Sequence, residues 1–202
     1  MADFDSKAKN WDEVPGRAER ANAVAAAIRA QVALSRTMTA LEYGCGTGLL
    51  SFGLQNELGA ITLADSSTGM LAVLEEKIAR GGITNMAPLQ LDLAVDPLPA
   101  ERFALVYTLM TLHHIPDTAK ILGSFHSLMH PGGILCIADL DKEDGSFHSN
   151  EDAFDGHNGF DRASLGVSLE QAGFTHVRFT TCYTLLKDAR PYPLFLAVAE
   201  KK

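Results

Sequence analysis

Hydrophobic residues recur with two alternating patterns along the first two thirds of the chain. Segments with apolar residues three or four positions apart are typical of helices, and short continuous apolar runs are typical of buried parallel strands. The predicted helices cover residues 18–32, 48–58, 67–80 and 117–129, and the predicted strands cover residues 39–43, 61–64, 87–91, 103–108 and 134–138. This alternation predicts an α/β fold with a mostly parallel, doubly wound sheet.

The last quarter of the chain departs from this alternation. Asp161 is placed to cap a helix that runs to Ala172, and two strands follow, at residues 177–183 and 194–199. The intervening residues 186–193 are too few for a parallel crossover. We therefore expect the last two strands to pair as an antiparallel C-terminal hairpin, which completes a seven-stranded sheet.

Length and composition favour a single domain over residues 1–202. Of the 202 residues, 47% are hydrophobic and 21% are charged, close to the averages of globular proteins. Within this domain we expect an N-terminal lid and helix segment (1–35), a central core (38–140), and a final part with a long loop and the hairpin (141–202).

Charge and the length of the apolar runs exclude several classes of protein. The 17 basic and 25 acidic residues give a formal charge of −8, which disfavours a non-specific grip on nucleic acid. No apolar run is long enough to cross a bilayer, and the first residues lack the pattern of a secretory signal. The three cysteines, Cys45, Cys136 and Cys182, are odd in number and widely spaced, which favours reduced thiols. We expect a cytoplasmic protein without metal, nucleic-acid or membrane partners.

A glycine-rich turn follows the first predicted strand. Gly44, Gly46 and Gly48 recur at every second position after Glu42, directly before a predicted helix. Glycine lets the backbone approach a ligand, and a helix N-terminus offers unpaired N–H donors, so the turn suits a nucleotide-like cofactor. Asp65 ends the next strand, where a carboxylate can accept hydrogen bonds from two ribose hydroxyls. The alternatives are a turn without a ligand and, for Asp65, the cap of the following helix.

A nicotinamide dinucleotide is the rival ligand, because it uses the same fold and an acidic residue at the same place. Its fingerprint needs a third glycine three positions after the second, where Ser51 stands if Gly46 and Gly48 are the first two. The glycine spacing therefore disfavours an NAD-dependent oxidoreductase.

These motifs resemble those of the class I S-adenosylmethionine-dependent methyltransferases. The resemblance extends over residues 38–202 and rests on residues 41–48, 65, 91–93, 103–115 and 128–133. The segment Leu112-His113-His114-Ile115-Pro116-Asp117 is similar to one in small-molecule methyltransferases, including the quinone-biosynthesis type. The resemblance implies a Rossmann-like fold, S-adenosyl-L-methionine as methyl donor, S-adenosyl-L-homocysteine as product, and a small-molecule acceptor.

The resemblance also implies roles for individual residues on the cofactor side. Glu42 would orient the turn and the ammonium group of the methionine moiety, Gly44 and Gly46 would face that moiety, Asp65 would hold the ribose, and Asp92 would accept from the adenine amino group. The other implied cofactor contacts are Cys45, Gly48, Ser66, Met70, Leu93, Thr108 and Leu109. For Met70 and Leu93, ordinary core packing is an equal alternative.

The acceptor side carries fewer signals. Methyl transfer from a sulfonium requires an aligned acceptor and no universal catalytic residue. His113 and His114 follow the fourth strand and are the candidates for positioning the acceptor or for a general base. Trp11, His148 and His157 are the candidate substrate or lid residues, and we expect an acidic, aromatic-lined pocket.

Three matters stay open from the sequence alone. The acceptor atom can be oxygen, nitrogen, carbon or sulfur, and the protein can be a monomer or a homodimer. A non-catalytic module that binds S-adenosylmethionine and an NAD-dependent oxidoreductase are the alternative functions.

Overall fold

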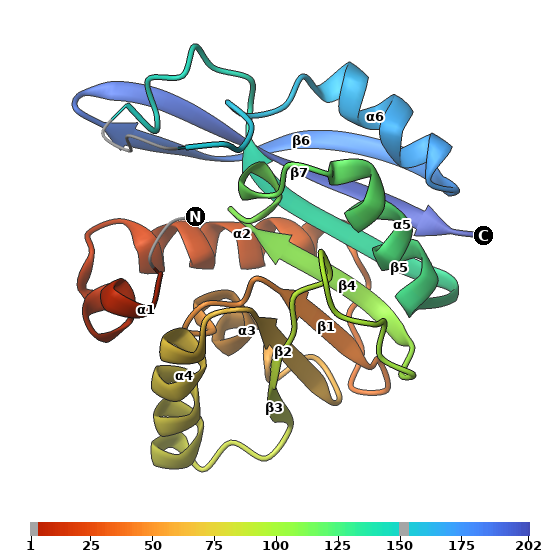
Figure 1. Cartoon of the computed structure of the whole chain (residues 1–202). Coiled ribbons are helices and arrows are strands. Elements are labelled where there is room, and N and C mark those ends of the chain that lie inside the picture. The colour runs from red at the N-terminus through yellow and green to blue at the C-terminus, as the bar shows by residue number, and fades with distance from the viewer. Residues whose placement is uncertain (1–3, 150–153) are drawn as a thin grey trace.

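All seven strands lie in one sheet in the order β3-β2-β1-β4-β5-β7-β6 (Figure 1). The computed structural model describes residues 4–149 and 154–202. The strands are β1 Ala40–Tyr43, β2 Ile61–Asp65, β3 Met86–Gln90, β4 Phe103–Leu109, β5 Met129–Leu140, β6 Phe174–Lys187 and β7 Arg190–Lys201. Strands β1 to β5 pair in parallel, and β7 pairs antiparallel with both β5 and β6. The predicted Rossmann-like seven-stranded fold is confirmed.

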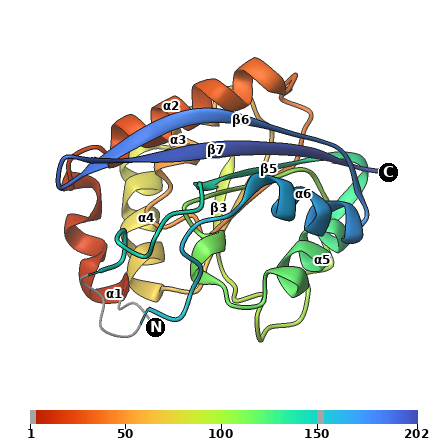
Figure 2. The same ribbon diagram turned by 90° about the horizontal axis from the view of Figure 1, so that it is seen from above.

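Helices cover both faces of this sheet (Figure 2). They are α1 Phe4–Lys7, η1 Ala8–Glu13, α2 Arg17–Gln31, α3 Leu49–Leu54, α4 Thr68–Gly81, η2 Leu112–His114, α5 Thr118–Leu128 and α6 Arg162–Gln171. Apolar side chains of α2, α3 and α4 form one core with the sheet, and those of α5 and α6 form a second core. No helix among the described residues is long and apolar enough to span a bilayer.

Side-chain caps explain where three of the helices begin. Ser67 accepts a hydrogen bond from the Met70 N–H at the start of α4. Asp117 caps α5 in the same way, and Asp161 caps α6, which confirms the cap predicted at that residue. Because Ser67 caps α4, the alternative role of Asp65 as the cap of that helix is wrong.

The structure corrects two predicted boundaries in the first two thirds of the chain. The helix after the glycine turn ends at Leu54 rather than at residue 58. Residues 131–133, predicted only as a helix stop, belong to β5, whose register against β4 shifts between Phe103 and Leu105. Such a shift absorbs extra residues without ending the strand.

The C-terminal hairpin is tighter than the sequence suggests. The two strands meet across Asp188 and Ala189, which both have positive φ, 50° and 60°. A two-residue turn with two positive φ angles matches the twist of antiparallel strands. The wider gap predicted at residues 186–193 is therefore wrong, although the antiparallel pairing is confirmed.

The parallel strands end on the side of the molecule where α1 lies (left in Figures 1 and 2). The sheet order reverses between β1 and β4, and ligands of open α/β sheets bind at such a switch point, beyond the carboxyl ends of the strands. The expected lid segment and long loop extend over residues 1–3 and 150–153, which lie outside the described residues. The division into lid, core and acceptor-side parts remains a prediction.

Candidate active site

The three glycines after β1 form a turn that only glycine fits without strain. Gly44, Gly46 and Gly48 have φ of 67°, 53° and 80°, in the left-handed region. A Cβ on Gly44 would overlap the Thr111 side chain, and one on Gly48 would lie 2.7 Å from Cδ1 of Leu74. The turn is therefore held closely between Thr111, which precedes η2, and Leu74 of α4.

Asp65 ties the end of β2 to this turn. Its Oδ2 accepts a hydrogen bond from the Gly46 N–H at 2.7 Å, and its Oδ1 accepts one from the Ser67 N–H at 2.9 Å. Burial raises the pKa of the carboxyl, and these backbone bonds partly offset the rise. Ser66, the neighbouring predicted contact, is exposed.

A buried polar cluster lies beneath the turn. The Ser51 hydroxyl donates to Glu42 and also forms a hydrogen bond with the Tyr107 hydroxyl. The Glu42 side chain is buried, and burial raises the pKa of its carboxyl to about 8. Glu42 therefore holds a proton at neutral pH until a cation approaches it.

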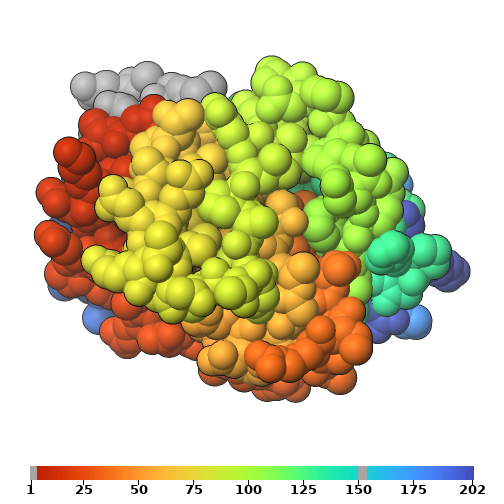
Figure 3. Space-filling view, turned by 90° about the horizontal axis from the view of Figure 1, so that it is seen from below, coloured from red at the N-terminus to blue at the C-terminus, as the bar shows by residue number. Residues whose placement is uncertain are grey.

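The N-terminal segment, α1 and η1, is fastened over the turn by two aspartates. Asp5 accepts hydrogen bonds from the Ser67 hydroxyl and the Gly69 N–H at the start of α4. Asp12 accepts from the Thr47 hydroxyl and pairs with Lys77, whose Nζ lies 2.6 Å from its Oδ2. Figure 3 shows this segment (red) lying against α4 (yellow).

Trp11 lies directly over the glycine turn. Its Nε1 stands 3.6 Å from the position that a Cβ on Gly46 would take. The Arg17 guanidinium lies 3.3 Å from the centre of the Trp11 ring and donates to the Trp11 carbonyl at 3.0 Å. These contacts fix the start of α2, and the role of Trp11 as a lid residue stays a prediction.

The predicted adenine-side residues lie at the end of β3. Asp92 accepts from the Ala94 N–H at 2.9 Å, and the Leu93 N–H donates to the Tyr43 hydroxyl at 3.1 Å. An adenine nitrogen can therefore use the Leu93 N–H only by displacing the Tyr43 hydroxyl. Met70 is buried in α4, with its Sδ 3.9 Å from the Cβ position of Gly46.

A cavity of about 220 Å³ opens between the N-terminal segment and the ends of β1 and β4. Seven of the predicted site residues line it: Trp11, Glu42, Cys45, Leu109, His113, His114 and His148. Thr108 is buried outside it, and its hydroxyl has no hydrogen-bond partner among the described residues. His157 also lies outside the cavity. Its Nε2 donates to the carbonyls of Ile115 and Pro116, at 3.1 and 3.2 Å.

A buried histidine and aspartate form the acceptor-side wall. His113 Nδ1 lies 2.6 Å from Asp139 Oδ1, and both side chains are almost fully buried. A carboxylate only accepts, so Nδ1 is the donor, and in the neutral ring Nε2, which is buried and has no hydrogen-bond partner among the described residues, carries the lone pair. Burial alone would raise the pKa of Asp139. The His113 ring and the N–H groups of Leu140 and His113 have a larger effect in the opposite direction, so the pKa lies below its usual value. Asp139 was missed because nothing in the sequence pairs it with His113.

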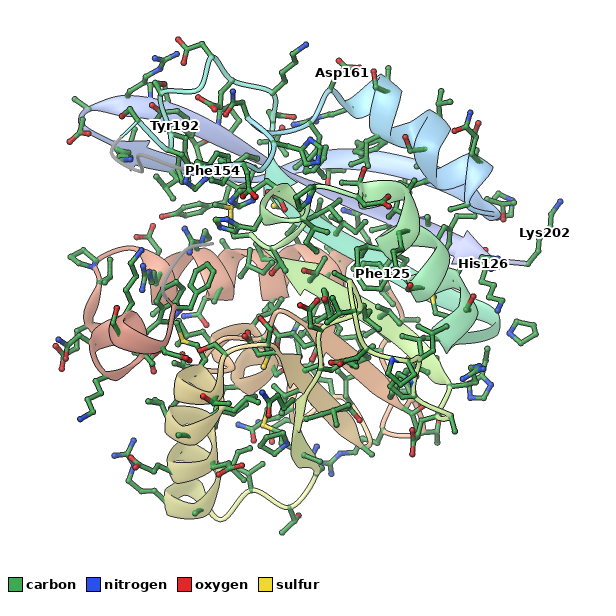
Figure 4. The ribbon with its side chains drawn as sticks, in the orientation of Figure 1. Phe125, His126, Phe154, Asp161, Tyr192 and Lys202 are labelled. Atoms are coloured by element: carbon green, nitrogen blue, oxygen red, sulfur yellow. The ribbon has the colours of Figure 1, made fainter. Side chains whose placement is uncertain are left out.

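Two more histidines stand beside His113. Burial, together with His113 and His148, lowers the pKa of His114 to about 3, so its ring is neutral at neutral pH. His148 stacks on Phe154, labelled in Figure 4, with ring centres 3.8 Å apart. One ligand atom from each of the three histidines lies within 4.8 Å of the others, an arrangement that could hold a metal ion.

The charge of the cavity differs from the acidic pocket that we expected. Lys7, Arg17 and Arg20 line it, and Glu42 is the one carboxylate among its described lining residues. Over the described lining the prediction of an acidic pocket is wrong, because the net charge of a chain does not set the charge of one pocket. Its aromatic lining is confirmed by Phe4, Trp11 and Phe147.

Comparisons with known proteins agree with this geometry. Residues 17–178 match a family model described as "Methyltransferase domain". A ubiquinone biosynthesis O-methyltransferase from Marinobacter nauticus is 30% identical over 111 residues, 54% of this chain and 46% of that protein. The chain spans about half the length of the curated relatives it matches.

Two solved structures share the fold. One is a SAM-dependent methyltransferase from Aquifex aeolicus, with a TM-score of 0.73, 21% identity and 98% of each chain covered. The other is the N-methyltransferase NodS from Bradyrhizobium japonicum in complex with S-adenosyl-L-homocysteine, with a TM-score of 0.72 and 17% identity over 95% of this chain and 91% of that one. The chain therefore belongs to the methyltransferase-domain family, which confirms the resemblance to class I S-adenosylmethionine-dependent methyltransferases.

Proposed function

We propose that this chain transfers the methyl group of S-adenosylmethionine to a small-molecule acceptor. One observation carries the proposal: Glu42 and Cys45, from the expected cofactor side, and His113 and His114, from the expected acceptor side, line the same cavity. A cofactor and an acceptor that enter this cavity meet there. An open cavity favours catalysis over a module that only binds the cofactor.

The residues at the glycine turn fit this cofactor. The three glycines of the turn carry no side chains of their own beneath Trp11, so a ligand can approach their backbone. Glu42 is a buried carboxyl that accepts a hydrogen bond from the neutral Ser51 hydroxyl. The ammonium group of the cofactor would supply the cation that a buried carboxylate needs as its partner. Asp65 keeps lone pairs for ribose hydroxyls, since a carboxylate accepts about four hydrogen bonds and two come from backbone N–H groups.

When bound, the cofactor supplies an electrophilic methyl group on a sulfonium, which is transferred by in-line displacement. The acceptor atom forms the new bond to carbon as the sulfur–carbon bond breaks, and the sulfur keeps the electron pair. His113 Nε2 takes up the proton that a hydroxyl or ammonium acceptor loses. Asp139 stabilises the resulting imidazolium, and the N-terminal segment excludes water.

Calorimetry and a methyl-transfer screen test this function in turn. The full chain should bind S-adenosylmethionine and S-adenosylhomocysteine, and labelled methyl should then appear on a member of a panel of small acids, amines, phenols and quinols. His113→Gln should lower the transfer rate by about a hundredfold or more and leave cofactor affinity unchanged. The control His130→Gln changes an exposed histidine on β5, and it should leave both unchanged.

A wild-type rate in His113→Gln would remove His113 from the mechanism. Binding of a nicotinamide cofactor in preference to S-adenosylmethionine would favour the oxidoreductase. The cytoplasmic location and the monomeric or homodimeric state, both expected from the sequence, remain predictions.

A further inference from the structure

We propose that the acceptor carries an oxyanion, a carboxylate or a phosphate, and that Arg20 binds this group. This inference rests on the proposed function, because it names the class of acceptor that the same cavity takes. It follows from the positive charge of the lining and from the unpaired state of one arginine.

Among the residues that the structure describes, Arg20 is a cation without a bonded partner. Its Nε is buried and has no hydrogen-bond partner, and its guanidinium forms no hydrogen bond or ion pair with any residue that the structure describes. The buried surroundings lower the pKa of the guanidinium. A buried polar group without a partner is unfavourable, and such groups in native proteins call for a ligand, a water or an ion.

The buried carboxylate of Asp139 does not satisfy Arg20. Asp139 attracts the guanidinium electrostatically. However, both oxygens of Asp139 already accept hydrogen bonds, from the His113 ring and N–H and from the Leu140 N–H. Glu42 is the one carboxylate among the described lining residues. Its pKa of about 8 leaves it protonated at neutral pH, so it adds no negative charge to the cavity. The described cavity wall thus holds an excess of positive charge that an anion would compensate.

Arg17 and Arg20 stand three positions apart on α2 and line the same cavity, but they have different neighbours. Arg17 stacks on Trp11, which covers the glycine turn, so it lies on the cofactor side. Arg20 lines the same cavity as His113, and its guanidinium is attracted electrostatically by Tyr183 on β6 and by Asp139 on β5, the partner of His113. We therefore assign Arg20 to the acceptor, and leave Arg17 for the carboxylate of the methionine moiety.

This placement explains what an anionic group would do for the reaction. A guanidinium binds a carboxylate or phosphate with two parallel hydrogen bonds, which fix orientation as well as position. An acceptor held at Arg20 by its anionic group would have its opposite end directed across the cavity. The anion would anchor the acceptor, while His113 handles the proton of its nucleophilic atom.

The test uses the full chain saturated with S-adenosylhomocysteine, so that cofactor contacts are already filled. Benzoate, its uncharged analogue benzamide and inorganic phosphate are titrated separately by calorimetry. Wild type should bind benzoate or phosphate but not benzamide, and the tighter of the two anions identifies the group. Arg20→Gln should weaken that binding by about tenfold to a hundredfold. Arg80→Gln, an exposed arginine on α4, is the matched control and should bind as wild type does.

The outcomes separate this inference from the proposed function. If wild type binds S-adenosylhomocysteine but neither anion at millimolar concentration, the oxyanion site is wrong and the function stands. If Arg20→Gln loses cofactor affinity and keeps anion affinity, Arg20 belongs to the cofactor and the inference is overturned. Failure of wild type to bind S-adenosylhomocysteine would instead contradict the proposed function.

Discussion

Asp65 accepts a hydrogen bond from the Gly46 N–H at 2.7 Å, so the carboxylate expected to hold the ribose also fixes the glycine turn. A second bond, from the Ser67 N–H, holds the other oxygen at the start of α4. One side chain thus sets the relative position of the turn and of the helix that follows β2. Its loss should affect both stability and cofactor binding.

Asp65→Ala should weaken S-adenosylmethionine binding and lower the free energy of unfolding by about 1–3 kcal/mol, because two backbone N–H groups lose their partner. Calorimetry and urea denaturation measure the two effects. Asp117→Ala serves as the control. It removes the cap of α5, which should lower the free energy of unfolding by a similar amount, and Asp117 does not line the cavity. Unchanged cofactor affinity in Asp65→Ala would end the ribose assignment.

The raised pKa of Glu42 predicts a specific pH dependence of stability. The folded chain keeps the Glu42 proton up to about pH 8, whereas an unfolded chain loses it near the ordinary value of 4.5. The unfolded state therefore binds fewer protons between these values, and the free energy of unfolding decreases as pH rises through that window. Glu42→Gln should reduce this decrease in urea denaturation series at pH 5, 6, 7 and 8. Parallel pH curves for the two proteins would show that Glu42 is already ionised.

Trp11 is the one tryptophan of the chain, so its fluorescence reports on the glycine turn alone. Adding S-adenosylmethionine should change the emission, because a ligand on the turn enters the immediate surroundings of the indole. The change should saturate at the concentration that calorimetry gives. Binding by calorimetry with constant emission would place the cofactor away from Trp11.

Asp139→Asn tests how His113 is positioned. The amide can no longer stabilise a protonated His113, and it can favour the wrong tautomer of the ring. The methyl-transfer rate should fall by about a hundredfold or more, with S-adenosylmethionine affinity unchanged. A rate that remains at the wild-type value would mean that His113 does not take up a proton.

Local sequence patterns were sufficient to place the glycine turn and Asp65 in the fold. The glycine turn, Asp65 and the strands that carry them depend on spacing within about 25 residues, and these were predicted with small errors at the boundaries. The length of the hairpin strands was underestimated, because Pro191 and Pro193 interrupt the strand pattern in the sequence. Both prolines nevertheless lie within β7. Strand extent there is set by pairing with β5 and β6.

Contacts between distant segments could not be predicted in this way. Asp12 reaches Thr47, and His113 reaches Asp139, across 35 and 26 positions. Arg20 was not considered because an arginine on a helix is usually exposed to solvent. Only the fold turns it toward a cavity, and the same fold gathers cations in a chain whose net charge is −8.

The most direct test of the account is a calorimetric titration of the full chain with S-adenosylmethionine and with S-adenosylhomocysteine. We predict saturable binding of both ligands, weakened in Asp65→Ala and retained in Asp117→Ala. Absence of binding by both ligands at high micromolar concentration would contradict it.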